Sequence, residues 1–256
     1  MSYKNIFDAH AHYDDSWFDE DRDELLVSLP EKGVCGVVNN AVDLKTAAKA
    51  IEFAEKYGYF YAAVGYHPEN IIGIPDDYLE KIAELTKHPK VVAIGETGLD
   101  YHWDTPKDLQ KRVFEEQIKL SLDLKMPLVV HDREAHGDTF DFLRKFKPNA
   151  LVHCFSGSVE LMREAVKLGC YVSLGGVVTF KNARHSIDVA SEIPIDKLLL
   201  ETDAPYMAPV PFRGKRNDSS KIIFAAEKIA TLRGLGVQEL LDITAENAKR
   251  FYNIND

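Results

Sequence analysis

The chain alternates short apolar runs with longer amphipathic stretches. Eight runs rich in β-branched, aromatic and other apolar residues occur at 5–10, 34–40, 59–67, 90–96, 126–132, 149–155, 169–176 and 196–203. Between them, segments such as 44–58, 109–125 and 158–169 place apolar residues three and four positions apart, the spacing of an amphipathic helix. Segments 220–233 and 237–254 have the same character, so the pattern predicts strands that alternate with helices.

This alternation predicts an α/β fold. Near-continuous apolar strands are typical of a parallel sheet that is covered on both faces, and eight strand–helix repeats favour a closed (β/α)8 TIM barrel. A doubly wound open sheet is the alternative, but no glycine-rich phosphate turn follows the first run. No linker or low-complexity segment interrupts the pattern, so we predict a single domain over residues 1–256, with a long functional loop at 204–219.

Nitrogen and oxygen donors stand at the ends of six predicted strands. The first case is the stretch FDAHAHYDD, in which His10 and His12 flank Ala11 and therefore point to the same side of a strand. The complete set is His10, His12, His67, Glu96, His131, His153 and Asp203. One such residue is usually an ordinary polar side chain at a strand end. In a barrel, however, all the carboxyl ends converge on one face, so the set predicts a shared site.

Imidazoles and carboxylates without thiolates suit Zn²⁺, Mn²⁺ or a similar divalent ion, whereas Mg²⁺ is less suited to several histidines. Six ligands are too many for one tetrahedral ion with an open position, and they suit two ions that share a carboxylate. We predict that Glu96 bridges the two ions. The other ligands divide into His10, His12 and Asp203 for one ion and His131 and His153 for the other.

Two such ions activate water for hydrolysis. Asp203 borders the predicted site, and a carboxylate has a second oxygen that can accept a proton, so we predict that Asp203 is both ligand and general base. Glu96, as the bridge, is the other predicted catalytic residue. Alternatively, Asp203 is a helix-capping or salt-bridged aspartate before Ala204.

Composition narrows the function. The 31 Lys and Arg and 41 Asp and Glu in 256 residues give a formal net charge of −10, which disfavours sequence-independent binding of duplex DNA by a broad basic surface. The three cysteines, Cys35, Cys154 and Cys170, are odd in number and show no paired spacing, so they are predicted to be reduced core residues of a cytoplasmic protein. We see no basic-then-apolar leader and no apolar stretch near the ~20 residues that span a bilayer, and we expect no membrane association.

Several short motifs follow one another along nearly the whole chain. They are DAHAH, GYHPE, GETGLDYHWD, HDREAH, HCFSGS, ETDAPYMAP and RGKRN. In this order they resemble the TatD-related metal-dependent deoxyribonucleases, a family of amidohydrolase-like barrels. The resemblance implies a divalent metal centre on the same six ligands and hydrolysis of phosphodiester bonds in DNA, often from the 3′ end toward the 5′ end. DNA ends or single strands would be the partner, and we expect no obligate protein partner.

The chain departs from the family pattern in two places. Members commonly continue the last motif as Arg-Gly-Lys-x-Asn-Glu-Pro, whereas this chain reads Asn217-Asp218-Ser219. Tyr13 stands where a leucine commonly follows the histidine pair. Neither change removes a predicted ligand, but the first puts the conformation of the loop and its substrate contact in question.

The loop after the eighth run carries the predicted phosphate anchor. Arg213 offers a bidentate fork to a phosphate. Lys215 and Arg216 are equally well explained as solvent-exposed loop charges. His67 either contacts the attacking or leaving oxygen or orders the turn before Pro68.

Three further residues are assigned to the surroundings of the predicted ions. Tyr101 and His102 are predicted substrate contacts, with a base packed on Tyr101, although an aromatic residue that supports Glu96 is equally plausible. Glu201 lies two residues before Asp203, so it is predicted to face the same side and to orient a histidine ligand. A buried salt bridge is the alternative for Glu201. Ser156 is not expected to be a nucleophile, because no histidine base remains for it.

The leading hypothesis is therefore a metal-dependent deoxyribonuclease that uses metal-activated water, with two ions of Mg, Mn or Zn. The alternative within enzymes is an amidohydrolase that acts on a small amide or lactone. Against it, Glu96 occupies the place where a modified bridging lysine would stand. A non-catalytic metal-binding or nucleic-acid-binding module is a third reading, disfavoured because structural sites tend to close their coordination sphere.

Overall fold

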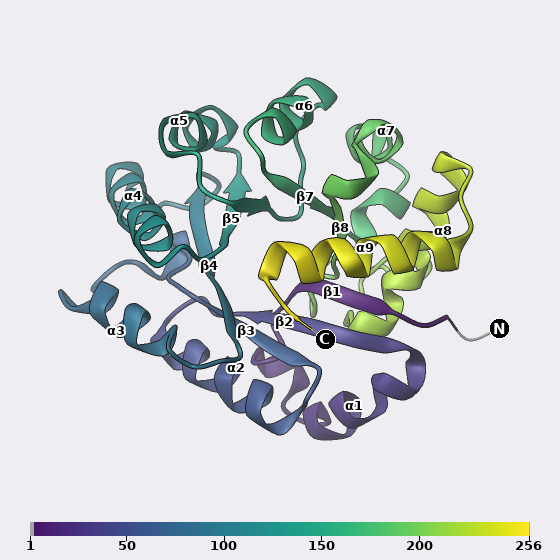
Figure 1. The fold of residues 1–256 in the computed structure, drawn as a ribbon, viewed down its shortest axis with the longest axis horizontal. Helices are drawn as coiled ribbons and strands as arrows, with labels where there is room; N and C mark the ends of the chain where they lie inside the picture. The colour runs from purple at the N-terminus through teal and green to yellow at the C-terminus, as the bar shows by residue number, and fades with distance from the viewer. Residues whose placement is uncertain (1–2, 256) are drawn as a thin grey trace.

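The computed structural model describes residues 3–255, which form a ring of eight parallel strands surrounded by helices (Figure 1). The strands are β1 (Ile6–Ala11), β2 (Val34–Asn40), β3 (Phe60–Val64), β4 (Val91–Asp100), β5 (Leu128–Arg133), β6 (Ala150–Val152), β7 (Tyr171–Leu174) and β8 (Leu198–Leu200). Each strand pairs with the next one along the chain. The predicted (β/α)8 barrel is thus confirmed. Residues 1, 2 and 256 of the predicted domain lie outside the described residues.

The helices of residues 3–255 are α1 (Arg22–Ser28), α2 (Leu44–Lys56), α3 (Tyr78–Leu85), α4 (Lys107–Leu124), α5 (His136–Phe146), α6 (Val159–Lys167), α7 (Arg184–Glu192), α8 (Ile222–Arg233) and α9 (Val237–Tyr252). Local signals set several of their ends. Asp43 forms a capping box with Thr46 at the start of α2, and the Ser158 side chain caps α6. No helix in this part of the chain is long and apolar enough to cross a membrane.

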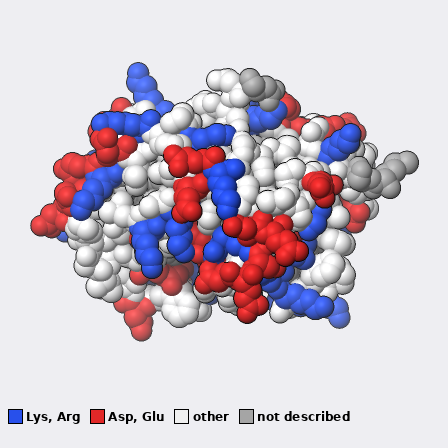
Figure 2. All heavy atoms as spheres, turned by 90° about the horizontal axis from the view of Figure 1, so that it is seen from below, with Lys and Arg blue, Asp and Glu red and all other residues white. Residues whose placement is uncertain are grey.

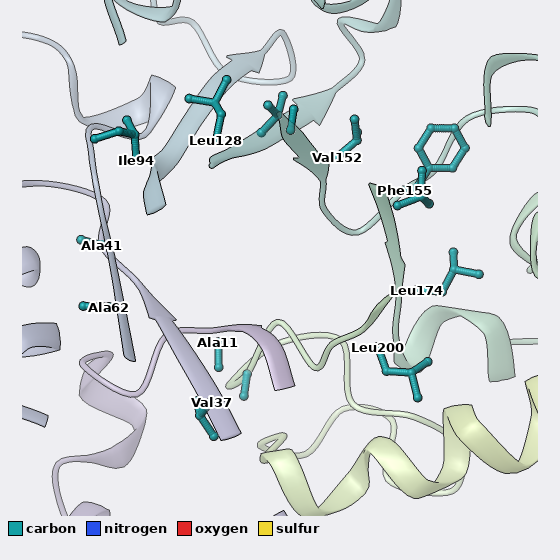
Figure 3. Packing of buried hydrophobic residues seen from close by; sticks show 14 of the residues in the cluster. Ala11, Val37, Ala41, Ala62, Ile94, Leu128, Val152, Phe155, Leu174 and Leu200 are labelled. Carbon is teal, nitrogen blue, oxygen red and sulfur yellow. The ribbon is translucent and has the colours of Figure 1, made fainter. Parts of the chain in front are cut away.

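Apolar side chains fill two layers. The outer layer lies between the strands and the surrounding helices, and Figure 3 shows Ile94, Leu128 and Leu174 pointing away from the centre of the ring. The inner layer fills the barrel and packs against Phe251 and Tyr252 of α9, whose Tyr252 hydroxyl donates to the carbonyl oxygen of Ala9 at 2.7 Å. Because α9 closes the amino-terminal end of the barrel, the carboxyl-terminal end is the one left for a site.

The ring is closed by the segment that follows β8. Asp203 donates its N–H to the carbonyl oxygen of His10 at 2.9 Å, and His12 donates its N–H to the carbonyl oxygen of Ala204 at 2.7 Å. These bonds flank the isolated bridge between Ala11 and Ala204. Closure therefore brings the last predicted ligand beside the first two.

The cysteines differ from one another in burial. Cys170 is buried, Cys154 is half-buried, and Cys35 is exposed. The prediction that all three are core residues is therefore wrong for Cys35, because its position in β2 faces solvent between buried neighbours.

The two departures from the family pattern contact each other. Ser219 donates its N–H to the Tyr13 hydroxyl at 2.8 Å, and that hydroxyl lies 2.7 Å from the Ser219 hydroxyl, which donates to the buried carboxylate of Asp8 at 2.7 Å. Proline has no N–H and leucine has no hydroxyl, so the usual pair of residues could not form these bonds. Thr202 also donates to Asp8, through its N–H at 2.9 Å and through its hydroxyl. The network ties the loop after β8 to β1.

We expect Tyr13→Phe to lower the free energy of unfolding by about 1–3 kcal/mol, because the change leaves the buried N–H of Ser219 without its acceptor. Ser219→Ala should have an effect of similar size. The double variant should lose less than the sum of the two, because both residues belong to one network. Urea denaturation measures all three, with Tyr57→Phe as the control because its hydroxyl bonds the exposed Asp23. Additive losses would contradict the coupling.

Candidate metal centre

The predicted ligands meet at the carboxyl-terminal end of the barrel. His10 lies in β1, Glu96 in β4 and His131 in β5, whereas His12, His67, His153 and Asp203 lie in the segments just beyond β1, β3, β6 and β8. Glu96 and the histidines His10, His12, His67 and His153 are buried, and His131 and Asp203 are partly buried.

Four ligand atoms form a first group around a common centre. His10 Nε2 and His12 Nε2 are 3.0 Å apart. Glu96 Oε2 is 3.3 Å from His10 Nε2 and 3.4 Å from His12 Nε2, and Asp203 Oδ1 is 3.7 Å and 3.5 Å from the same two atoms. A tetrahedral ion with bonds of about 2.0–2.2 Å separates its ligand atoms by about 3.3–3.6 Å, so the group fits one ion.

The second group uses the other oxygen of Glu96. Glu96 Oε1 is 2.7 Å from His131 Nδ1 and 2.8 Å from His153 Nε2, and these two nitrogens are 3.2 Å apart. His67 Nε2 lies 3.6 Å from the same oxygen. Glu96 therefore turns one oxygen toward each group, as a bridging carboxylate would. The structure also places His67, predicted as a substrate contact, among the candidate ligands.

The charges of the cluster favour a bound cation. Burial alone would raise the pKa of Glu96, but His153 and His10 hold that pKa well below its usual range. Burial likewise opposes ionisation of Asp203, yet the nearby imidazoles of His12 and His10 lower its pKa. Burial lowers the pKa of His10, but at His12, His131 and His153 the neighbouring carboxylates outweigh burial and raise the pKa. Protons on these imidazoles balance the charge of the carboxylates, and a divalent ion would displace those protons and supply the positive charge in their place.

Side chains behind the ligands fix some of their orientations. His12 Nδ1 faces the carbonyl oxygen of Asn40 at 2.8 Å, and His131 Nε2 faces the buried carboxylate of Asp100 at 3.0 Å. Such partners set the tautomer and the direction of a ligating ring. Asp100 was not predicted, although it stands within the GETGLDYHWD motif, four residues after the bridge.

Glu201 lies beside a histidine ligand, but the strand alternation from which this was predicted does not hold. β8 ends at Leu200 and Asp203 has φ 56°, so regular alternation does not extend to Asp203. Glu201 accepts a short hydrogen bond from the Ser173 hydroxyl, and its Oε1 is 3.7 Å from His153 Nδ1. It therefore lies behind a histidine ligand, at a distance longer than a hydrogen bond.

A cavity of about 800 Å³ opens over the two groups. Aromatic side chains in its lining are Trp103, Phe155, Phe180 and Tyr206. Arg133 is the only Lys or Arg among the described residues that line it. Neither Trp103 nor Arg133 was predicted, although they lie next to His102 and two residues after His131.

Two of the predicted substrate contacts lie outside this lining. Tyr101 donates its hydroxyl to Asp138 at 2.5 Å, and His102 Nδ1 pairs with the exposed Glu134 at 3.0 Å. These partners hold both side chains away from the cavity. The structure therefore places Tyr101 and His102 on the surface beside the cavity and not in its lining, contrary to the prediction that they contact substrate.

The cationic residues of the 213–216 loop differ in their contacts. Arg216 forms two hydrogen bonds of 2.6 Å with Asp21, so its guanidinium is already occupied. Arg213 is exposed and stacks on Phe180, with its guanidinium carbon 3.9 Å from the ring centroid. It lines a groove next to the metal cavity rather than the cavity itself.

A (β/α)8 barrel with histidine and carboxylate ligands at its carboxyl-terminal end defines the chain as a metal-dependent hydrolase by class. A family model described as TatD related DNase matches residues 7–253. The chain belongs to this family.

Relatives and solved structures agree with this family. The chain is 44% identical to the uncharacterized metal-dependent hydrolase YabD of Bacillus subtilis (strain 168), over 98% of this chain and 100% of the relative. It is 31% identical to the 3'-5' ssDNA/RNA exonuclease TatD of Citrobacter koseri, over 97% of this chain and 99% of the relative. The crystal structure of YJJV, a TatD homolog from Escherichia coli K12, aligns with a TM-score of 0.91 and 30% identity, covering 98% of this chain and 99% of that one.

Glu96→Gln should weaken metal binding at both groups of ligands, because each oxygen of Glu96 faces one of them. We expect about two Zn²⁺ or Mn²⁺ ions per chain in the unaltered protein and a loss of affinity of at least about 10-fold for both in the variant. His12→Ala should weaken metal binding at the first group only. Equilibrium dialysis with elemental analysis measures the stoichiometry, and Glu134→Gln, an exposed carboxylate near the cavity, is the control. Unchanged binding by Glu96→Gln would refute the bridge.

Proposed function

We propose that this protein hydrolyses phosphodiester bonds of DNA at 3′ ends or in single strands and removes nucleotides from the 3′ end. The observation that carries the proposal is the bridged ligand cluster beneath a cavity with aromatic walls. Two divalent ions side by side suit the in-line displacement of a phosphate ester. The printed name of the Citrobacter koseri relative, a 3'-5' ssDNA/RNA exonuclease, supports the same polarity.

The size and charge of the site support recognition of an end. A volume of about 800 Å³ is within the range of about 300–1,000 Å³ for small-ligand sites, so it suits a terminal nucleotide. Aromatic side chains such as Trp103 and Tyr206 offer faces on which a base can stack. Figure 2 shows acidic and basic side chains intermixed on one face of the molecule, without the broad basic area that duplex binding requires.

Residues of the chain have distinct proposed roles. When bound, divalent ions at these ligands would supply Lewis acidity toward a phosphate and make water a stronger acid. The residues that would hold and orient the ions are His10, His12, Glu96, His131 and His153. Asp203 is ionised, and its Oδ1 faces the first group, so its other oxygen can accept a proton from the attacking water. Arg133 lines the cavity and can position a phosphate.

Digestion of 3′-labelled and 5′-labelled single-stranded oligonucleotides tests the proposal. After EDTA treatment, re-addition of Mg²⁺, Mn²⁺ or Zn²⁺ should restore stepwise release of nucleotides from the 3′ end. Asp203→Asn should lower kcat by about 10²- to 10⁴-fold, because the variant lacks the proton acceptor. Glu134→Gln should keep the activity. If the protein cleaves no DNA with any of the three ions but hydrolyses small amides or lactones, the amidohydrolase alternative is favoured.

A further inference from the structure

A second hollow adjoins the metal cavity. This side groove, of about 480 Å³, is lined by Val177, Phe180, Lys181, Asn182, Ala183, Val210 and Arg213. Val177 and Phe180 line both hollows, so the side groove and the metal cavity are adjacent. A chain-like substrate with one residue at the metals can therefore extend into the side groove.

The charges of the side groove suit an anion. Its lining contains Lys181 and Arg213 but no Asp or Glu among the described residues. Within residues 3–255, no carboxylate lies within ion-pair distance of either cation, in contrast to Arg216, which is paired with Asp21. In addition, α7 begins directly after Ala183 without a side-chain cap, and an uncapped helix start favours negative charge nearby.

Another part of the metal cavity lining is unsuited to a polyanion. Asp14, Asp15 and Glu69 line that cavity, and Asp15 accepts a hydrogen bond from Tyr206. Trp17, the exposed aromatic beside Tyr206, lies next to this acidic part of the chain. A phosphate backbone that left the metals on this side would meet carboxylates, so charge favours the side groove.

The walls of the side groove are held in place. Val210 donates its N–H to the Thr179 hydroxyl at 2.9 Å, which joins the two loops that form the groove. A Cβ at Gly176 would come within 2.1 Å of the Met207 carbonyl oxygen, so the loops approach each other as only glycine permits. Phe212 packs on Phe224 of α8 with ring centroids 5.2 Å apart, next to Arg213. The cation and the Phe180 ring are thus presented by a packed surface.

We propose that the side groove binds the nucleotide on the 5′ side of the scissile phosphate, with its base against Phe180 and its phosphate on Arg213 and Lys181. The proposal rests on the proposed function and adds a substrate preference to it. Oligonucleotides occupy both hollows, whereas a small diester reaches only the metals. Turnover of oligonucleotides should therefore depend on the side groove more than turnover of small diesters does.

The test compares kcat/KM for a single-stranded 10-mer with kcat/KM for bis(p-nitrophenyl) phosphate. We expect Arg213→Ala and Lys181→Ala each to lower the ratio of the two values about 10-fold, with the larger part of the change in KM for the 10-mer. The slope of log kcat/KM against log salt concentration should also become shallower by about 0.7 for each cation removed. Arg213→Lys should recover part of the loss. Thermal melting checks that each exposed substitution leaves the fold intact.

Lys215→Ala is the matched control, because Lys215 is an exposed cation of the same loop and lines neither hollow. It should keep the ratio of the unaltered protein. If the unaltered protein cleaves the 10-mer but the Arg213 and Lys181 variants keep its ratio, the side-groove proposal is wrong and the proposed function stands. A lowered ratio in Trp17→Ala alone would assign the strand to the acidic part of the metal cavity beside Trp17. Failure of the unaltered protein to cleave any oligonucleotide would overturn both proposals.

Discussion

Closure of the parallel ring is the constraint on which the candidate site depends. β1 and β8 come from opposite ends of the chain, and the bonds from Asp203 to His10 and from His12 to Ala204 join β1 to the segment after β8. A parallel ring places all carboxyl ends of its strands on one face. The ligands are far apart in the sequence, so they meet only when the ring closes. The complete ligand set therefore exists only in the closed barrel.

The two ends of the barrel have different roles: one stabilises the fold, and the other carries the candidate metal ligands. At the amino-terminal end, α9 covers an apolar interior with Phe251 and Tyr252, and burial of such side chains stabilises the fold by about 1.5–3 kcal/mol for each one. At the other end, the polar cluster buries Glu96 and Asp203 among imidazoles, which is costly without a compensating charge. A bound cation would supply that charge. The apolar end thus supports a ligand cluster that has little stability of its own.

Sequence pattern predicted the barrel and the positions of the ligands because both follow from local regularities: apolar runs mark strands, and strand ends mark one face. The surroundings of the ligands follow no such regularity. Tyr101 and His102 lie beside the predicted bridge in sequence, but Asp138 and Glu134 hold them outside the cavity. Trp103, one residue further, lines the cavity. Asp100 supports His131 through a contact across two strands, which spacing along one strand cannot reveal.

An acidic protein that acts on the proposed anionic substrate must place its few useful positive charges well. The net charge of −10 repels a polyanion at long range, but salt screens such repulsion beyond about 8–10 Å, so the local surroundings of the substrate decide binding. Here Asp14, Asp15 and Glu69 line one part of the metal cavity, whereas Lys181 and Arg213 line the groove that adjoins it. These carboxylates repel the phosphates of a strand. A strand that extends past the metals on both sides is therefore disfavoured. Under the proposed function, a strand admitted from one side only would present an end to the metals, and this asymmetry would give a physical basis for cleavage from an end.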